Sequence, residues 1–481
     1  MTPLGKILKN TSALALAQIL NPLVAIFLTM SLARLGGSAG LGVYTFAISL
    51  VALFEILACL GVREYVVREV ARRPEDWSKY FFTTVLLGSG SALLLQCALM
   101  LFSHVMGYDA AMRSALFLAG FSLYPTVIYN ASESIFAASQ QMQYPSAVTI
   151  GENFVRALLS IACLRLGYEA QTLFIVFVLS RTLSGALLVT MLFRKMGRPA
   201  WQWDRSTAQK ILRVAPTFAL LAGAAALYWR LDLLFLSKFG GNTEVGIYNA
   251  AYRLMYIFYM IASSLMTSLY PLFSRSFTEA PEQFHLLGAK TMKYLLLAFF
   301  PIAVMTTMLA PQIVPLLYGE AFAASVQVLQ LVIWVIIPLG IAGVFANTLL
   351  ASNQQRKDLQ VNLARLAIAL VLFAVLVPRF GSLGAIAALL FSLLAGVFLQ
   401  YQFLARQFSK TQLARYIGKP ALASLAMAAV MLSCAELHFL IAAALGVCGY
   451  IAAIMLQNTF NGADRSFLAA LRMHKGFEPC R

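Results

Sequence analysis

The stretch LARLGGSAGLGVYTFA at residues 32–47 recurs as LSKFGGNTEVGIYNAA at residues 236–251, 204 positions later. The two stretches align without a gap and share leucine, paired glycines, a further glycine, tyrosine and alanine at equivalent positions. Upstream, KILK at 6–9 matches KILR at 210–213 at the same offset. A long chain that repeats an uncommon pattern at a fixed offset is predicted to contain two copies of one structural unit.

Two further matches extend the repeat towards the end of each copy. FAASQQM at 136–142 resembles LLASNQQ at 349–355, and RLG at 165–167 resembles RFG at 379–381. All the matches occur in the same order, which a duplication explains and chance does not. The glycines of the opening stretch are interpreted as a short hairpin between two helices, because such turns need positive φ and close packing of helix ends.

The composition indicates a membrane protein. The 481 residues are 60% hydrophobic and 11% charged, and the mean hydropathy is +0.79. A soluble domain carries about 25% charged residues. Apolar runs of about 20 residues recur along the whole chain, which favours transmembrane helices over the shorter, alternating strands of a barrel.

The apolar runs predict fourteen transmembrane helices. Their expected ranges are 12–34, 41–61, 80–104, 113–137, 144–165, 171–193, 215–237, 246–272, 292–317, 325–350, 359–377, 383–404, 418–435 and 438–456. The first six helices form one copy and the next six the other. Because each copy has an even number of helices, both copies start on the same side of the membrane. The predicted fold is therefore all-α and polytopic, with a parallel repeat about a pseudo-two-fold axis along the membrane normal.

We accordingly expect an N-lobe at 1–200, a C-lobe at 201–410, and two extra helices with a cytoplasmic tail at 411–481. Transporters with such repeats bind the substrate between the lobes. Two bundles that enclose no cavity are the alternative.

The distribution of basic residues predicts the orientation. The segments that are cytoplasmic if the N-terminus is inside carry 26 of the 36 Lys and Arg, and the opposite connections carry five. This positive-inside bias predicts that both termini are cytoplasmic. It also explains the net charge of +17 without nucleic acid as a partner. The first apolar run has no cleavage site of the kind that a signal peptide needs.

Several classes of site are disfavoured by the sequence. The six cysteines are scattered without CxxC spacing and there are four histidines, so neither a metal site nor a cofactor is expected. No phosphate-binding loop, nucleophile elbow or paired catalytic carboxylate is evident. We expect a transporter and not an enzyme.

Several segments resemble bacterial polysaccharide flippases of the Wzx type, in the multidrug/oligosaccharidyl-lipid/polysaccharide exporter superfamily. The segments are LARLGGSAGLGVYTFAIS, GVREYVVREVAR, RLDLLFLSKFGGNTEVGIYNAAYRL, LYPLF and LYGEAFAAS. The resemblance implies translocation of an undecaprenyl-pyrophosphate-linked oligosaccharide from the cytoplasmic to the periplasmic leaflet by V-shaped alternating access. It implies as cargo a repeat unit of O-antigen, capsule or exopolysaccharide, and as partners a polysaccharide polymerase and other glycan-assembly proteins.

Four basic residues within the expected spans are candidates for a substrate cavity. A charge within a membrane is costly, so a charge that is present there is expected to have a structural or functional role. The four residues are Arg156, Arg181, Arg230 and Arg253. A guanidinium group binds phosphate oxygens bidentately, which suits a pyrophosphate. At the repeat offset Arg230 corresponds to Ile26 and Arg253 to Ser49, so the fold of the first copy does not need these charges.

Acidic residues within the spans are candidates for ion coupling or gating: Glu55, Glu133, Glu152 and Asp232. Glu152 and Arg156 are four residues apart on one helix and can pair. An Asp232–Arg253 bridge across a hairpin is also expected. Pro22 and Pro338 are candidate hinges, because proline removes a helical hydrogen bond.

Three other functions remain open. A multidrug/toxin extrusion antiporter of the same superfamily is the nearest, although the first helix carries no acid of the kind such proteins use. A membrane glycosyltransferase or polymerase is disfavoured by the short outer connections. A scaffold for glycan assembly is the third. The energy source is open between membrane potential, protons and sodium.

Overall fold

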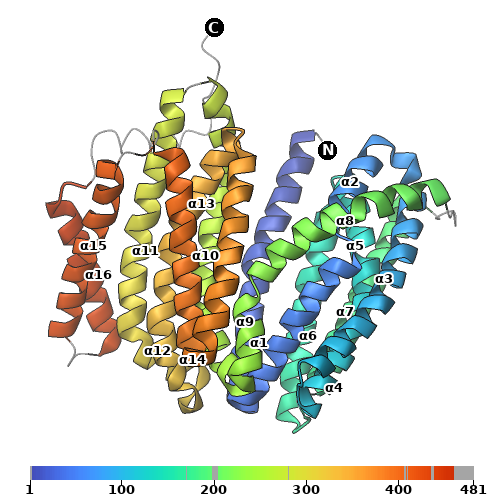
Figure 1. The fold of residues 1–481 in the computed structure, drawn as a ribbon, viewed down its shortest axis with the longest axis horizontal. Coiled ribbons are helices and arrows are strands. Elements are labelled where there is room, and N and C mark those ends of the chain that lie inside the picture. Colours follow the sequence, from blue (N-terminus) through green and yellow to red (C-terminus); the bar gives the residue numbers. More distant parts are fainter. Residues whose placement is uncertain are drawn as a thin grey trace. The chain divides into compact units, whose positions relative to one another are not determined.

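The computed structural model describes residues 3–169, 171–197, 204–279, 281–405, 408, 410–434 and 438–459, and every regular element within them is a helix (Figure 1). The α-helices are α1 (Pro3–Ala58), α2 (Arg63–Arg72), α3 (Trp77–Val105), α4 (Ala110–Gly120), α5 (Leu123–Ala138), α6 (Gln143–Arg165), α7 (Thr172–Met196), α8 (Arg205–Tyr228), α9 (Leu231–Phe239), α10 (Gly241–Glu279), α11 (Pro281–Tyr318), α12 (Ala324–Val332), α13 (Ile336–Ala351), α14 (Gln355–Leu404), α15 (Lys410–Ser433) and α16 (Phe439–Leu456). Short 3₁₀ turns occur at Pro74–Asp76, Glu320–Phe322 and Ile333–Val335. The expected cytoplasmic tail after residue 459 lies outside the described residues.

Ten helical segments of the described chain are long and apolar enough to cross a membrane. Two of them, in α1 and α14, each consist of two helices joined at a glycine with non-helical angles, Gly37 (φ 67°, ψ −175°) and Gly381 (φ 53°, ψ −130°). The all-helical, multi-pass membrane fold is therefore confirmed. The exact number of fourteen spans stays a prediction.

Three expected spans are broken by non-helical or 3₁₀ residues. The span at 113–137 is divided between α4 and α5, the span at 215–237 between α8 and α9, and the span at 325–350 between α12 and α13. The last break is the 3₁₀ turn Ile333–Val335, which ends three residues before Pro338. A proline cannot donate the helical hydrogen bond, so a change of winding beside it has a local cause.

The described chain forms two compact units. Unit 1 comprises Met1–Ala250, Leu317–Phe322 and Phe373–Ala385, and unit 2 comprises Ala251–Leu316, Ala323–Leu372 and Ile386–Arg481. These units are defined by contacts, whereas the expected domains at 1–200, 201–410 and 411–481 follow the sequence repeat and stay a prediction. The difference arises partly because α8 packs on α1 and α3 in unit 1.

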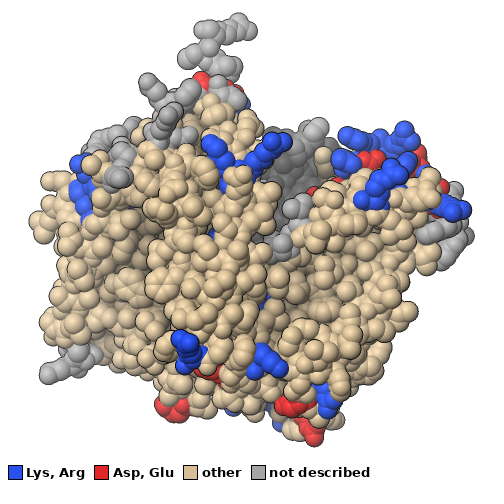
Figure 2. Space-filling view, viewed as in Figure 1, with Lys and Arg blue, Asp and Glu red and all other residues tan. Residues whose placement is uncertain are grey.

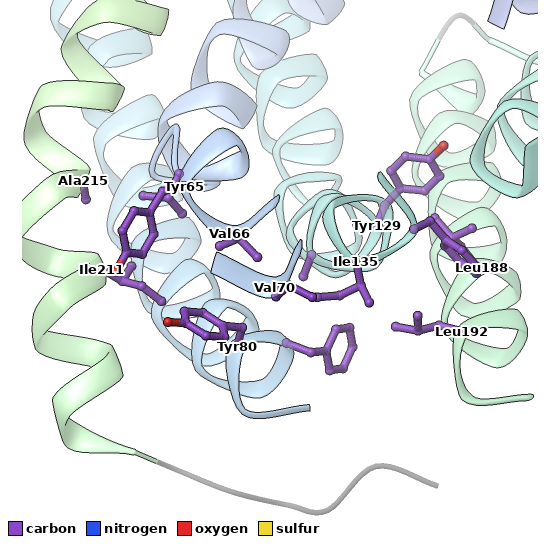
Figure 3. Packing of buried hydrophobic residues seen from close by; sticks show 14 of the residues in the cluster. Tyr65, Val66, Val70, Tyr80, Tyr129, Ile135, Leu188, Leu192, Ile211 and Ala215 are labelled. Carbon is purple, nitrogen blue, oxygen red and sulfur yellow. The ribbon is translucent and has the colours of Figure 1, made fainter. Parts of the chain in front are cut away.

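A hydrophobic core in unit 1 is formed by buried side chains from α2, α3, α5, α7 and α8 (Figure 3). The short helix α2 buries Tyr65, Val66 and Val70 and leaves Arg68 and Arg72 exposed. The segment REYVVREVAR is therefore an amphipathic helix that covers the end of the bundle.

The first turn of α8 is capped by Asp204. Its carboxylate accepts hydrogen bonds from the backbone N–H groups of Ser206 and Thr207, both at 3.1 Å, and Lys79 lies 3.2 Å away. Hydrogen bonds from the Thr207 and Ser206 side chains hold the pKa of this carboxyl far below its usual range. Such a cap fixes where a helix begins.

In unit 2, α15 and α16 lie side by side and pack with α11 around Met427, Met431, Tyr450 and Ile454 (Figure 1). A Cβ on Gly446 would lie 2.5 Å from Met431 Cγ, so glycine allows this pair of helices to approach closely. On the face shown in Figure 2, charged side chains gather towards the helix ends of each unit, and the surface between them is almost entirely uncharged. That distribution fits a surface in contact with lipid.

The two copies of the opening stretch contact each other in unit 1. A Cβ on Gly42 would lie 1.7 Å from the carbonyl oxygen of Asn242, and a Cβ on Gly246 would lie 2.0 Å from the carbonyl oxygen of Ser38. Each pair, Gly42 with Gly246 and Ser38 with Asn242, is separated by the repeat offset. The contact is therefore reciprocal, as two-fold related copies require, and it demands glycine at both centres.

A second reciprocal contact involves the repeated basic residue. Arg34 Nε donates to the Leu317 carbonyl at 3.0 Å, at the end of α11. Its counterpart Lys238 donates to the Met106 carbonyl at 2.6 Å, at the end of α3. A cation near a helix C-terminus satisfies carbonyls that have no helical partner. The glycines and the basic residue of the opening stretch thus have a packing role that extends beyond a local hairpin.

We predict that Gly42→Ala and Gly246→Ala each destabilise the protein by about 1–3 kcal/mol, because overpacking forces the helices apart. Gly40→Ala is the matched control, since a Cβ there meets nothing within 4 Å and alanine favours a helix over glycine. Thermal unfolding of the purified protein in detergent measures the difference. Equal melting temperatures for the three variants would contradict the close contact between Gly42 and Gly246.

Candidate functional site

Three charged residues of unit 1, Glu55, Glu152 and Arg181, are joined in a network centred on an ion pair. Arg181 Nη1 lies 3.1 Å from Glu152 Oε2, and the Glu152 side chain is 3% exposed. Ser184 donates to the same oxygen at 2.8 Å. Glu152 and Arg181 each stand nine residues into their helices, α6 and α7, which is about 14 Å along the axis. The pair therefore lies at mid-depth.

A second carboxylate, that of Glu55 on α1, joins the network through hydroxyl groups. Its Oε1 accepts hydrogen bonds from Ser122 and Thr126, both at 2.9 Å. Thr126 also accepts a hydrogen bond from Arg181 Nε at 3.0 Å. The Arg181 guanidinium lies over the Tyr129 ring, 4.8 Å from its centroid. The Arg181 guanidinium is thus paired directly with Glu152 and is connected to Glu55 through the Thr126 hydroxyl.

Arg156 lies beside this network with different partners. Its Nη2 donates to Asn153 at 2.7 Å, and Asn153 donates to Asn21 on α1 at 2.9 Å. The guanidinium also lies 5.4 Å from the centroid of the Phe177 ring. Its buried Nε has no hydrogen-bond partner among the residues that the structure describes. The expected pairing of Glu152 with Arg156 is wrong, because Glu152 pairs with Arg181 instead.

Arg230 and Asp232 lie at the break between α8 and α9, where Arg230 is the residue before α9. Arg230 Nη1 donates to Ser49 on α1 at 3.0 Å. Asp232 is 6% exposed, and its two oxygens accept from the Leu233 N–H at 2.7 Å and the Tyr248 hydroxyl at 2.9 Å. Asp232 is in unit 1 and Arg253 in unit 2, so their bridge stays a prediction.

The remaining candidates have individual surroundings. Glu133 on α5 lies 3.2 Å from Arg63, which begins α2, so this acid is paired at a helix end. Arg253 lies on α10 in unit 2 and is half-buried. Pro22 lies inside the continuous helix before Gly37. The roles of all these residues, including the two prolines as hinges, stay predictions.

Unit 2 contains a cavity of about 380 Å³ between α10, α11 and α13. Its wall is mainly apolar, with Met266, Phe299 and Leu339, and polar groups come from Thr267 and Asn347. Gly340 and Gly343 leave space on the α13 side. A cavity of this size and lining suits an apolar or amphipathic group.

Sequence reasoning missed the hydroxyl groups of Ser122 and Thr126 and the partner of Glu152. Ser122 lies in the two-residue break between α4 and α5, and Gly120 and Pro125 on either side of that break were a signal in the sequence. The Glu152–Arg181 pair joins residues 29 apart on two helices, and periodicity within one helix does not reveal such a contact. For these contacts the sequence did offer one signal: Glu55 and Glu152 both lie within expected spans, and a buried carboxylate there needs a polar or charged partner.

The helical fold and its charged interior define a multi-pass membrane protein. A family model described as polysaccharide biosynthesis protein matches residues 7–277. A second model, described as lipid II flippase MurJ, matches residues 195–457. The chain belongs to the polysaccharide biosynthesis protein family. No curated protein matches it.

Solved structures of transporters share the fold. The lipid II flippase MurJ in an inward closed conformation aligns with a TM-score of 0.78 and 15% identity, over 93% of this chain and 98% of that chain. An inward-facing MATE family transporter of the MOP superfamily aligns with a TM-score of 0.63 and 15% identity, over 81% and 95%. A MOP superfamily transporter from Pyrococcus furiosus aligns at 0.53 and 14% identity, over 84% and 94%.

The matched families and aligned structures are flippases and transporters. The protein is therefore a transporter and not an enzyme. The resemblance to polysaccharide flippases is confirmed at the level of family and fold.

We predict that Glu152→Gln destabilises the protein by about 3–5 kcal/mol, because it leaves the Arg181 charge buried without its partner. Glu152→Gln combined with Arg181→Gln is expected to recover much of this loss, since both charges are removed. A double-mutant cycle on melting temperature measures the coupling. Strictly additive effects of the two substitutions would contradict the pairing.

Proposed function

We propose that the protein translocates an undecaprenyl-pyrophosphate-linked oligosaccharide from the cytoplasmic to the periplasmic leaflet of a bacterial inner membrane. The cargo is a repeat unit of O-antigen, capsule or exopolysaccharide, and transport proceeds by alternating access. The family match over residues 7–277 carries this proposal, and half-buried arginines within the spans support it. Both termini are cytoplasmic in this proposal, and a polysaccharide polymerase and other glycan-assembly proteins are its partners.

Arg156 and Arg230 are the arginines best suited to the pyrophosphate. Neither forms an ion pair with another residue that the structure describes, whereas Arg181 is paired with Glu152. A guanidinium group that is not engaged in an ion pair can offer its planar fork to phosphate oxygens. Arg181 serves in this scheme to hold the two acids in place, and Arg253 adds a further positive charge on α10.

Glu55 is the acid best suited to ion coupling. Glu55 Oε1 and the Ser122 and Thr126 hydroxyl groups bring three oxygens together. A carboxylate can bind a proton, and oxygen atoms are the ligands that hard cations prefer. Glu152, Glu133 and Asp232 have stronger or more complete partners in unit 1. A second function, an ion-coupled multidrug/toxin extrusion antiporter, is favoured by this acidic network together with the likeness of fold to MATE transporters.

We predict that Arg156→Ala and Arg230→Ala each lower the rate of glycan delivery to the outer leaflet by about tenfold or more, as loss of a charge-assisted hydrogen bond implies. Arg165→Ala is the control, because Arg165 is exposed at the last turn of α6. The assay is the leaflet distribution of the prenyl-linked glycan in a deletion strain that carries each variant. Normal outer-leaflet delivery in the empty deletion strain would refute the flippase.

Glu55→Gln is predicted to abolish the dependence of transport on an imposed ion gradient, because the amide cannot release or bind a proton and binds cations poorly. Transport of the lipid-linked glycan and efflux of a cationic dye are measured in the same proteoliposomes under proton and sodium gradients. Gradient-driven dye efflux without glycan transport would favour the antiporter. An unchanged gradient dependence in the variant would exclude Glu55 as the coupling residue.

A further inference from the structure

The cavity of unit 2 between α10, α11 and α13 has a row of polar and aromatic side chains on one wall. Tyr259, Ser263, Thr267 and Tyr270 all line it from α10. Their spacing of four, four and three residues places them on one face of that helix. Among the described residues, the ten segments apolar enough to cross a membrane do not include α10. This helix therefore presents to the cavity a face that is suited to more than hydrocarbon.

The polar groups around the cavity can bind a ligand from two sides. On α10, Thr267 Oγ1 donates to the Ser263 carbonyl of its own helix at 2.9 Å, and the hydroxyl oxygen retains lone pairs as acceptors. On α13, Asn347 Nδ2 donates to the Gly343 carbonyl at 3.0 Å, and an amide has a second N–H and an oxygen besides. Ser263, Thr267 and Tyr270 are exposed. Hydrogen-bond donors and acceptors thus line the cavity from α10 and from α13.

Glycine shapes the α13 side of the cavity. Phe299 on α11 is 4% exposed and lies against α13, where a Cβ on Gly340 would come within 2.7 Å of its Cε2 atom. A Cβ on Gly343 would lie 3.6 Å from Met266 Cγ. The volume of about 380 Å³ lies at the lower end of the range for small-molecule sites. The cavity therefore suits a compact ligand.

The charge of the lining restricts the ligand further, because no charged side chain is among the described residues that line the cavity. An ionised ligand would lose its hydration there without gaining a counter-ion, which is costly. An aliphatic ligand would have the opposite defect, since it would cover the Thr267 hydroxyl and the Asn347 amide without a hydrogen bond. The lining favours a ligand that is neutral, has several hydrogen-bonding groups and also has an apolar face.

We propose that this cavity binds one neutral sugar ring of the cargo, a proposal that rests on the glycan flippase function. A pyranose ring has hydroxyl groups at its edge and C–H bonds on its faces. The C–H bonds have a partial positive charge, so they pack on the electron-rich face of an aromatic ring such as Tyr270. The sugar hydroxyls bind Thr267 and Asn347. Because the pyrophosphate is assigned to Arg156 and Arg230 in unit 1, charge and sugar are recognised by different parts of the chain.

Binding of soluble methyl glycosides to the full-length protein in lipid nanodiscs tests the site without transport. The probes are the methyl glycosides of glucose, galactose, rhamnose and N-acetylglucosamine, with methyl glucuronide as the charged counterpart. Saturation-transfer NMR measures binding. We expect at least one neutral glycoside to bind at least about tenfold more tightly than the glucuronide, as the cost of burying an unpaired carboxylate implies.

Thr267→Val and Asn347→Leu nearly conserve the shape of the wall and remove its polar groups. Each should weaken binding of the neutral glycoside by about threefold to tenfold, which is the value of a hydrogen bond. Thr190→Val is the matched control, because Thr190 on α7 also donates to a carbonyl of its own helix, at 2.8 Å, and lies in unit 1. Its binding should equal that of the wild type. Thr267 and Thr190 are both exposed, so both valine variants should fold, and their melting temperatures verify this.

The outcomes separate the site from the flippase function. Binding of no neutral glycoside, or equal binding to the wild type, Thr267→Val and Asn347→Leu, would overturn the site. If these two variants instead melt at a higher temperature and bind glycoside as the wild type does, lipid fills the cavity and the sugar assignment is overturned. Absence of glycoside binding in a protein that delivers the lipid-linked glycan overturns this proposal alone. Glycoside binding by a protein that delivers no glycan refutes the flippase function alone.

Discussion

The close contact between Gly42 and Gly246 is the constraint on which the arrangement of unit 1 depends. Two helices approach until the backbone of one lies where a side chain of the other would stand. Small residues permit such contacts in membranes, where helices associate through packing and not through exclusion from water. Because the contact is reciprocal between residues one repeat apart, it fixes the first copy against the beginning of the second. The caps by Arg34 and Lys238 then hold the ends of α11 and α3 to the same region.

Charges in the interior of unit 1 follow from the cost of burying them. Glu152 and Arg181 are buried together, and hydroxyl groups of Ser184 and Thr126 complete their hydrogen bonds. Removing either charge alone leaves the other uncompensated, so the pair is maintained as a unit. Glu55 is attached through Thr126 and has no guanidinium group to itself. The network is therefore tightly held at Glu152, which has an ion pair, and less constrained at Glu55, which has hydrogen bonds from hydroxyl groups.

Much of the fold was predictable because a transmembrane helix needs a long apolar run, which can be recognised in the sequence. The breaks at Gly37 and Gly381 fall between expected spans, since glycine alone adopts such angles without strain. The breaks at Phe121–Ser122 and Trp229–Arg230 contain no glycine, and each includes a residue whose side chain hydrogen-bonds to α1. The site was predictable as a set of charges, because ionisable residues in spans are rare. Their pairing was not, since helix spacing shows Glu152 near Arg156 but says nothing of Arg181 on another helix.

The two copies share the reciprocal glycine contact and the basic caps but differ in their charges within the expected spans. Arg230 corresponds to Ile26, and the residue that accepts its hydrogen bond, Ser49, is the counterpart of Arg253. Glu244 corresponds to Gly40 and binds Ser382 at the start of the second half of α14, at 2.9 Å from its N–H. The first copy has Ile26 and Ser49 at the positions of Arg230 and Arg253, so the common fold of the two copies does not require an arginine at either position. Glu244 has a local structural partner that explains it, whereas the Arg230 guanidinium donates to a neutral hydroxyl. Under the proposed flippase function, an anionic cargo is the partner that this guanidinium group would fit, because its planar fork matches phosphate oxygens.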